Sequence, residues 1–143
     1  MIVWGGYGGY LNTGGIYTPA CPPLTSASNP SSVPDGSTDS PFLVGLNGDG
    51  TLALSWSAAC NTSDYAVMAG DLSTLAGGYN HNSLVCTTGG LTSASVNPAG
   101  ATLYFLVVPH NAAVEGSYGR DSAAAERPAA SLACYAQSVG SCP

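Results

Sequence analysis

The sequence predicts an all-β protein, a β-sandwich of about seven strands, on three observations. From Pro41 onward, short runs that are apolar, or that alternate apolar with polar residues, recur at a spacing of roughly 8 to 15 residues. Gly, Asn and Pro separate these runs and mark turns. The chain has 143 residues, 45% of them hydrophobic, which suffices for one domain with an ordinary core but not for a second full domain.

The predicted strands follow the apolar runs one by one. Asn47-Gly48-Asp49-Gly50, built from residues that tolerate positive φ, forms the turn between the first two. Residues 71–78 have room for one helical turn. The expected strands are Phe42 to Leu46, Thr51 to Trp56, Tyr65 to Ala69, Ser83 to Cys86, Ser93 to Val96, Leu103 to Val108 and roughly Tyr118 to Ala124.

Two of these strands supply the predicted core. Alternation from Leu52 to Trp56 places three large apolar side chains on one face. Tyr104, Leu106 and Val108 are expected to face them from the opposite sheet. Trp56 is then the centre of the core, and packing rather than cofactor binding accounts for these aromatic side chains.

The flanking stretches differ in composition. Residues 1–19 are rich in Gly and aromatic residues, carry no charge, and predict an N-terminal arm with two short strands, Ile2 to Trp4 and Gly15 to Tyr17. Residues 20–40 are rich in Pro and Ser and predict an extended linker that separates rather than packs. The sandwich is expected over residues 41–128, and residues 129–143 are expected to form a disulfide-stapled tail.

Three segments of the predicted sandwich resemble a known family. They are Leu52-x-Leu54-x-Trp56, Asp64-Tyr65-x-Val67, and Tyr104-x-Leu106-x-Val108-Pro109-x-Asn111-Ala112-Ala113-x-Glu115-Gly116. This pattern resembles fibronectin type III domains over residues 41–128. The run from Tyr104 to Pro128 also resembles the fibronectin type III-like domain that closes many large secreted bacterial proteins. The resemblance implies a fibronectin type III or immunoglobulin-like sandwich in a secreted bacterial protein.

Residues 1–19 resemble part of one kelch repeat. The matching residues are Met1-Ile2-Val3-Trp4-Gly5-Gly6, followed by Leu11-Asn12-Thr13-Gly14-Gly15-x-Tyr17-x-Pro19. A kelch blade needs about 50 residues, and a propeller needs at least about four blades, so this segment cannot form one by itself. The resemblance therefore implies neither a propeller nor the copper oxidase chemistry of some kelch proteins.

The charge balance excludes several partners. The formal net charge is −6 and the basic residues are Arg120 and Arg127 alone, so we expect no binding to nucleic acid or to an anionic membrane. The longest apolar run, Leu103 to Val108, is far shorter than the roughly 20 residues that span a bilayer. Residues 1–10 lack the basic and apolar regions of a signal peptide, so a mature form or a fragment is expected.

Five cysteines without a C-x-x-C motif predict disulfides rather than a zinc site, and hence an oxidising compartment. Pairing between neighbours in the sequence joins Cys60 to Cys86 and Cys134 to Cys142, although five cysteines permit other pairings. Cys21 is then left over in the linker and is a candidate for an intermolecular disulfide. The predicted localisation is secreted, extracellular or at the cell surface.

No motif for catalysis or metal binding stands out. G-x-S-x-G and H-E-x-x-H are absent, and His81 and His110 are interpreted as surface histidines because neither has a ligand set or a placed nucleophile. We therefore expect no enzyme activity, metal or cofactor; a hydrolase using either histidine with a nearby carboxylate is a third, weaker alternative. A charged cluster near the last two strands is expected to form a solvated edge: Glu115, Arg120, Asp121, Glu126 and Arg127.

These observations predict an extracellular structural protein that assembles with itself. A two-stranded apolar ribbon is marginal in water, and a linker of about 20 residues can carry it to a partner edge. Addition of the arm to the sheet of a neighbouring copy, repeated head to tail, would generate a filament. The side chains that this contact would bury are Val3, Trp4, Tyr7, Tyr10 and Tyr17.

Other interpretations stay open. The arm can fold back on its own domain, or it can be the cut end of a longer protein. The alternative function is a monomeric carbohydrate-binding or adhesion module, with glycans as partners, since exposed Tyr and Trp stack on sugar rings. The sequon Asn61-Thr62-Ser63 makes Asn61 a candidate glycosylation site.

Overall fold

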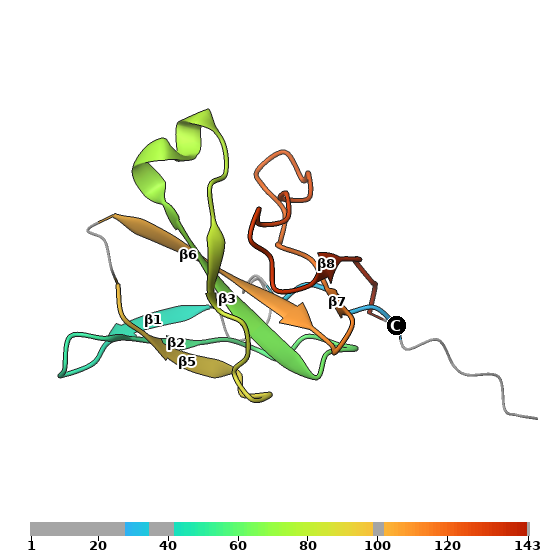
Figure 1. Cartoon of the computed structure of the whole chain (residues 1–143), viewed down its shortest axis with the longest axis horizontal. Coiled ribbons are helices and arrows are strands. Elements are labelled where there is room, and N and C mark those ends of the chain that lie inside the picture. Colours follow the sequence, from blue (N-terminus) through green and yellow to red (C-terminus); the bar gives the residue numbers. More distant parts are fainter. Residues whose placement is uncertain (1–27, 35–41, 99–101, 143) are drawn as a thin grey trace, which may run out of the picture.

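The strands form two sheets (Figure 1). The computed structural model describes residues 28–34, 42–98 and 102–142. One sheet is antiparallel, in the order β1-β2-β5, and contains β1 (Leu43–Leu46), β2 (Leu52–Ser55) and β5 (Ser93–Val96). The other has the order β4-β3-β6-β7-β8 and contains β3 (Asp64–Asp71), β4 (Asn82–Val85), β6 (Leu103–His110), β7 (Val114–Glu115) and β8 (Ala136–Gln137). The predicted all-β class is confirmed.

Strands β1 to β6 lie where the apolar runs predicted them, because turn residues bound each run. The helical turn expected within residues 71–78 is also present, as the 3-10 helix η1 (Leu72–Gly77). Asp71 caps this helix by accepting a hydrogen bond from the Ser73 backbone N–H at 2.8 Å.

The seventh predicted strand, Tyr118 to Ala124, is wrong. This segment is a loop with an isolated bridge between Arg120 and Glu126. The Glu126 carboxylate accepts hydrogen bonds from the Tyr118 backbone N–H and the Ser117 hydroxyl, both at 2.8 Å. A side chain thus takes the place of a neighbouring strand. The strand that pairs with β6 is instead β7, and β8 from the C-terminal tail runs parallel to β7.

The two sheets enclose a core. Leu54 and Trp56, in and just after β2, pack against Tyr65 and Val67 of β3. Trp56 is 5% exposed, and its ring meets that of Tyr65 edge-on with 5.5 Å between centroids. The predicted place of Trp56 in the core is confirmed.

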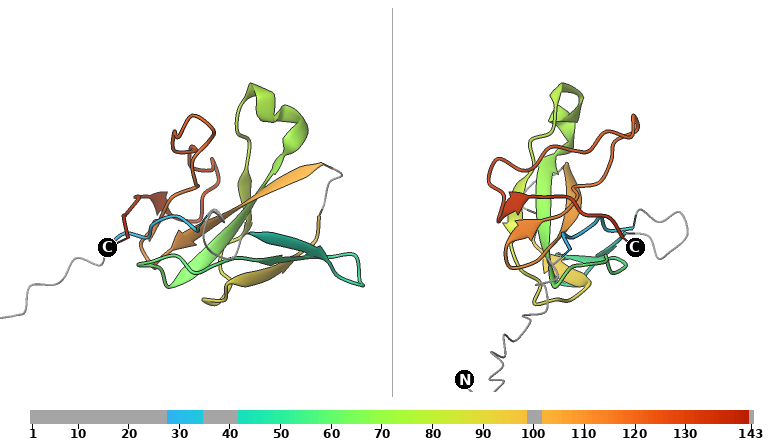
Figure 2. Two further views of the ribbon diagram at one scale, coloured as in Figure 1. Left: turned by 180° about the vertical axis from the view of Figure 1, so that it is seen from behind. Right: turned by 90° about the vertical axis from the view of Figure 1, so that its right-hand side faces the viewer.

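The second sheet is covered on both faces, and this corrects the predicted orientation of β6. Phe105 and Val107 pack toward the first sheet, whereas Leu106 and Val108, expected there together with Tyr104, contact a cluster on the opposite face. In Figure 2 the orange and red C-terminal segment lies on that side, away from β1, β2 and β5. Because β6 is apolar on both faces, its alternation could not tell which face meets the first sheet.

Residues 28–34 pack against the second sheet, contrary to the expectation that residues 20–40 separate rather than pack. Pro30 and Ser31 are buried. The Ser31 carbonyl accepts a hydrogen bond from Ser117 N, and the Pro30 carbonyl accepts one from Gly140 N, both at 2.9 Å. At Gly116 and Gly140 a Cβ would collide with backbone atoms of this segment. Glycine at both positions therefore lets the segment lie flat against the domain.

Two disulfides form, but with a pairing different from the predicted one. Cys60 pairs with Cys142 and Cys86 with Cys134, with 5.7 Å between Cα atoms in each. The expected pairs Cys60 with Cys86 and Cys134 with Cys142 are wrong. The extended strand β8 lies between Cys134 and Cys142 and pairs with β7, which holds the two tail cysteines apart. The tail is therefore tied to the sheets instead of closed on itself.

Candidate interaction surface

Both histidines are buried, so their interpretation as surface histidines is wrong. His81 is 3% exposed and stacks on Tyr118, with 5.3 Å between ring centroids. Its Nε2 lies 2.9 Å from the Pro128 carbonyl, which needs a donor, so Nε2 carries the proton and Nδ1 accepts from the Tyr104 hydroxyl at 3.2 Å. Burial lowers the pKa of His81 and outweighs the bond to Pro128. The ring is held neutral.

Glu115 is fully buried, although it was expected on a solvated edge. Its Oε1 accepts hydrogen bonds from Cys134 N at 2.9 Å and from Tyr135 N at 3.1 Å, and its Oε2 accepts one from the Tyr118 hydroxyl. Burial, together with this bond to Glu115, raises the pKa of Tyr118. The carboxylate thus fixes the C-terminal tail against β7.

Asp64 organises the loop that follows β4. Its carboxylate accepts hydrogen bonds from Thr88 N and Gly90 N, both at 2.9 Å, and from the Thr87 hydroxyl at 2.5 Å. Burial acts to raise the pKa of Asp64, but these hydrogen bonds outweigh it and hold the pKa well below its usual range. His110, also 3% exposed, places Nε2 3.8 Å from Asp64 Oδ2, too far for a hydrogen bond.

These buried groups and the half-buried Asp64 hold loops in place. Their partners are largely backbone N–H and carbonyl groups of the same domain. Over residues 28–34, 42–98 and 102–142, no group of three or more His, Cys, Asp or Glu side chains could hold a metal ion. The candidate interaction surface is therefore a free edge of one of the sheets.

The free edge of β5 can accept another strand. Among the described residues β5 has β2 as its strand neighbour. Trp56 N donates to Thr92 O at 3.1 Å, and hydrogen-bonded pairs alternate along an antiparallel ladder. The backbone groups of Ala94 therefore face β2, and those of Ser93 and Ser95 point to the open side, where they can pair with an added strand.

The edge of the second sheet on the same side, β4, is less regular. Its pairing with β3 shifts between Val67 and Met68, so that Leu84 has no residue opposite. Such β-bulges twist an edge and disfavour further pairing. β5 is thus the regular edge on this side of the molecule.

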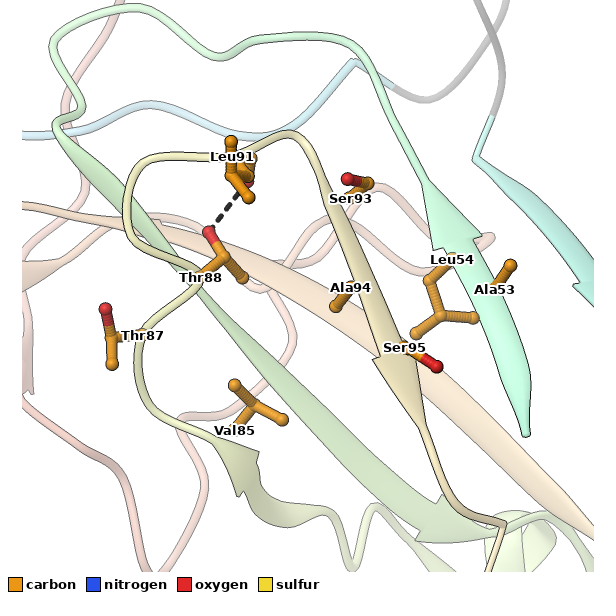
Figure 3. A pocket seen from close by; sticks show the side chains of 9 residues that line it. All are labelled: Ala53, Leu54, Val85, Thr87, Thr88, Leu91, Ser93, Ala94 and Ser95. Atoms are coloured by element: carbon orange, nitrogen blue, oxygen red, sulfur yellow. Dashed lines mark hydrogen bonds between the residues drawn. The ribbon is translucent and has the colours of Figure 1, made fainter. Parts of the chain in front are cut away.

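A groove of about 490 Å³ lies between β5 and the end of β4 (Figure 3). From β5, Ala94 points toward Val85 and Thr88, the latter two at the end of β4 and in the loop after it. Ala94 and Val85 also pack partly against the core. The groove exists because Ala94 faces the core, and its small side chain leaves unfilled space where a larger one would pack. Its lining consists of aliphatic and hydroxyl side chains and carries no charge.

The other edge of the first sheet, β1, is a rival acceptor. Leu43, Val44 and Leu46 are 54%, 52% and 77% exposed. Asn47 N donates to Thr51 O at 2.8 Å, so the same alternation directs the backbone groups of Val44 and Leu46 to the open side. β1 therefore combines a free backbone edge with apolar side chains.

The sequence predicts open sheet edges in general but does not predict the groove. The available signal is the run Ser93-Ala94-Ser95, three small residues in succession within the predicted strand Ser93 to Val96. The predicted arm residues, Val3, Trp4, Tyr7, Tyr10 and Tyr17, lie outside the described residues, as does Cys21.

The candidate glycosylation site lies in an exposed turn. Asn61 has a φ of 58°, and its Nδ2 donates to the Ser141 carbonyl at 3.4 Å. This weak contact leaves the side chain at the surface. Glycosylation at Asn61 stays a prediction.

Comparison with known proteins identifies no relative, so a function has to be inferred from the fold and the surface. No protein-family model matches the chain, and no curated protein or solved structure matches it significantly. No helix in the described part of the chain has the length and apolar character needed to cross a membrane.

Proposed function

We propose that the two sheets form a fibronectin type III or immunoglobulin-like sandwich. In immunoglobulin-type sandwiches the first, second and fifth strands share one sheet and the third, sixth and seventh share the other. The orders β1-β2-β5 and β4-β3-β6-β7 agree with this arrangement, with the fourth strand beside the third. The strand order supports the type of sandwich expected from the sequence resemblance.

We further propose that the protein is an extracellular structural subunit that assembles with itself, the N-terminal arm of one copy adding to a sheet of the next. The observation that carries this proposal is that the two edges of the first sheet, β1 and β5, are each bordered by apolar surface. An arm of residues 1–19, apolar, aromatic and uncharged, has the composition of a strand that such an edge receives. The two disulfides favour an oxidising, extracellular setting.

The alternative, a monomeric carbohydrate-binding or adhesion module, has less support. Sugar rings stack on exposed aromatic side chains, yet every aromatic side chain in the described residues is buried or partly buried. The groove beside β5 is lined without aromatic residues. Both observations favour assembly over sugar binding for this domain.

Electron microscopy of the full chain tests the proposal. Negative staining of the protein, isolated without denaturant or reductant, is expected to show long uniform fibres. The double variant Val3→Asp/Trp4→Asp is expected to show dispersed particles with an unchanged melting temperature, because an added strand would then place unpaired carboxylates against an apolar sheet edge. Asn12→Asp/Thr13→Asp adds the same charge at polar positions of the arm and serves as the control that keeps the fibres.

Two results would contradict assembly through the arm. Dispersed wild-type particles would exclude the filament, and specific glycan binding by those particles would establish the alternative. Fibres formed equally by the Val3→Asp/Trp4→Asp variant would show that another surface joins the copies.

A further inference from the structure

We propose that the edge that receives the arm is β5, with side chains of residues 1–4 of a second copy seated in the groove between β5 and the end of β4. This inference rests on the proposed self-assembly and names its acceptor site. The competing edge of the same sheet is β1, and the two edges differ in their side-chain pockets and in the charge around them.

The first distinction is the presence of a side-chain pocket. Strand addition draws affinity from backbone pairing and specificity from pockets that take alternate side chains. At β5 the outward backbone groups of Ser93 and Ser95 run beside a groove of about 490 Å³. This volume lies within the roughly 300 to 1,000 Å³ of ordinary ligand pockets. The exposed side chains of β1 form an open surface, and a smaller pocket near this strand, of about 190 Å³, includes Phe42, which directly precedes β1.

The second distinction is charge. The arm carries no charged residue, and neither does the lining of the groove beside β5. The smaller pocket near Phe42 has Arg120 and Arg127 in its wall, which are the two basic residues of the whole chain. A strand without charged side chains would take these guanidinium groups out of water and supply no counter-charge, although Arg127 already donates to the Tyr118 carbonyl at 3.3 Å; this desolvation is unfavourable. The absence of charged side chains in both the arm and the lining therefore favours the groove beside β5 over the pocket near Phe42.

The third observation is the length of the apolar run in the arm. Met1-Ile2-Val3-Trp4 has four apolar residues, and β5 has four residues, Ser93–Val96. Successive side chains of an added strand point to opposite faces, so either Val3 or Trp4 enters the groove in any register. The glycines that follow Trp4 end the run.

The chain that leads to the arm leaves the domain at the edge away from the groove, which favours a contact that repeats from copy to copy. Pro30 and Ser31 are held by Gly140 and Ser117, next to β7 and β8. In the order β4-β3-β6-β7-β8, this lies at the edge of the second sheet opposite to β4 and the groove. An arm that starts at one edge and a receptor at the other form a heterologous contact, which repeats as an open filament.

Hydrogen exchange on the full chain locates the acceptor without altering the domain. Amide exchange is compared between wild-type fibres and the monomeric Val3→Asp/Trp4→Asp variant. We expect the Ser93 and Ser95 amides to exchange at least about tenfold more slowly in the fibres, because an added strand supplies their acceptors. The Val44 and Leu46 amides of β1 are expected to exchange at the same rate in both.

A matched pair of proline variants gives an independent test. Ser95→Pro removes an outward N–H from β5, and Val44→Pro does the same at β1. We expect Ser95→Pro to raise the critical concentration for assembly by about tenfold or more, since both a backbone bond and close approach are lost, and Val44→Pro to leave it unchanged. Thermal unfolding shows whether each variant still folds. If either variant does not fold, the amide-exchange comparison described above decides which edge accepts the arm.

The outcomes separate the inference from the proposed function. Fibres protected at β5 support both. Fibres protected at β1, or blocked by Val44→Pro alone, overturn the inference while self-assembly stands. A monomer whose β5 amides are protected at every concentration overturns both, because the arm then folds back on its own domain. A wild-type chain that forms no fibres, without such protection, also overturns both.

Discussion

At the scale of single residues, buried polar side chains hold the loops of this domain. Glu115 is the clearest example, because its two oxygens accept from two backbone N–H groups of the tail and from the Tyr118 hydroxyl. A buried carboxylate is tolerated only when such donors replace water. Removing one donor therefore costs more than an average hydrogen bond.

We expect Tyr118→Phe to lower the free energy of unfolding by about 1.5 to 3 kcal/mol, since it leaves one oxygen of a buried carboxylate without its donor. Urea unfolding at neutral pH measures this change. Tyr79→Phe is the control, because no described hydrogen bond involves the Tyr79 hydroxyl, and it should change stability by less than about 0.5 kcal/mol. Equal effects of the two substitutions would contradict a role for the Tyr118 hydroxyl.

The lowered pKa values of His81 and Asp64 predict how the free energy of unfolding depends on pH. The pKa of His81 in the folded state lies below its usual 6.5, so protonation favours unfolding, and stability should fall as pH decreases below about 6.5. The pKa of Asp64 is also lowered, from 3.8, so its contribution is complete above the unfolded-state value and is lost as pH falls below about 4.

Melting temperatures measured from pH 8 to pH 2 check both slopes. We expect His81→Gln to remove the decline that begins near pH 6.5 and Asp64→Asn to remove part of the decline below pH 4. Because each substitution also changes stability directly, the slope with pH, and not the absolute melting temperature, is the quantity to compare. An unchanged slope in either variant would contradict the assignment of that group.

At the scale of elements, the C-terminal tail ties residues 28–34 and two loops to the second sheet. β8 pairs with β7, Gly140 donates to Pro30, and the disulfides join Cys142 to Cys60 and Cys134 to Cys86. The disulfides span 82 and 48 residues of sequence. In the chain-entropy model, loops of this length contribute roughly 4 to 5 kcal/mol each, more than the short loops of the sequence-based pairing.

We expect Gly140→Ala to loosen the contact between the tail and residues 28–34, because the added Cβ would collide with the Asn29 backbone. A loss of about 1 to 3 kcal/mol follows from overpacking of this kind. Gly48→Ala, where a Cβ meets nothing within 4 Å, is the control. Limited proteolysis should cut near residues 28–34 faster in Gly140→Ala alone. Equal protection of both variants would show that the segment is held by other contacts.

At the scale of the whole molecule, the disulfide pattern restricts what Cys21 can do. Of five cysteines, four are paired within the domain. A bond between copies that leaves these pairs intact must therefore join Cys21 to Cys21. Since each Cys21 forms one bond, it can link copies only in pairs and cannot by itself build a polymer.

We expect non-reducing gel electrophoresis of the denatured protein to show a covalent dimer at most, and Cys21→Ser to show the monomer. Fibre formation should persist in Cys21→Ser if the groove beside β5 is the joint. A ladder of larger covalent species in the wild type would contradict this, because it would require exchange of the Cys60 or Cys86 disulfides between copies.

The sequence by itself determined the class of fold and the positions of β1 to β6, because strand signals are local: alternation, run length and turn residues. The tertiary structure decided what depends on distant partners. It selected which face of β6 meets the first sheet, since both faces are apolar. It buried His81, His110 and Glu115, and it paired the tail cysteines with loops far away in sequence because β8 holds them apart. The groove beside Ala94 was also decided by the tertiary structure, because a small side chain leaves open space only where the neighbouring strands do not fill it.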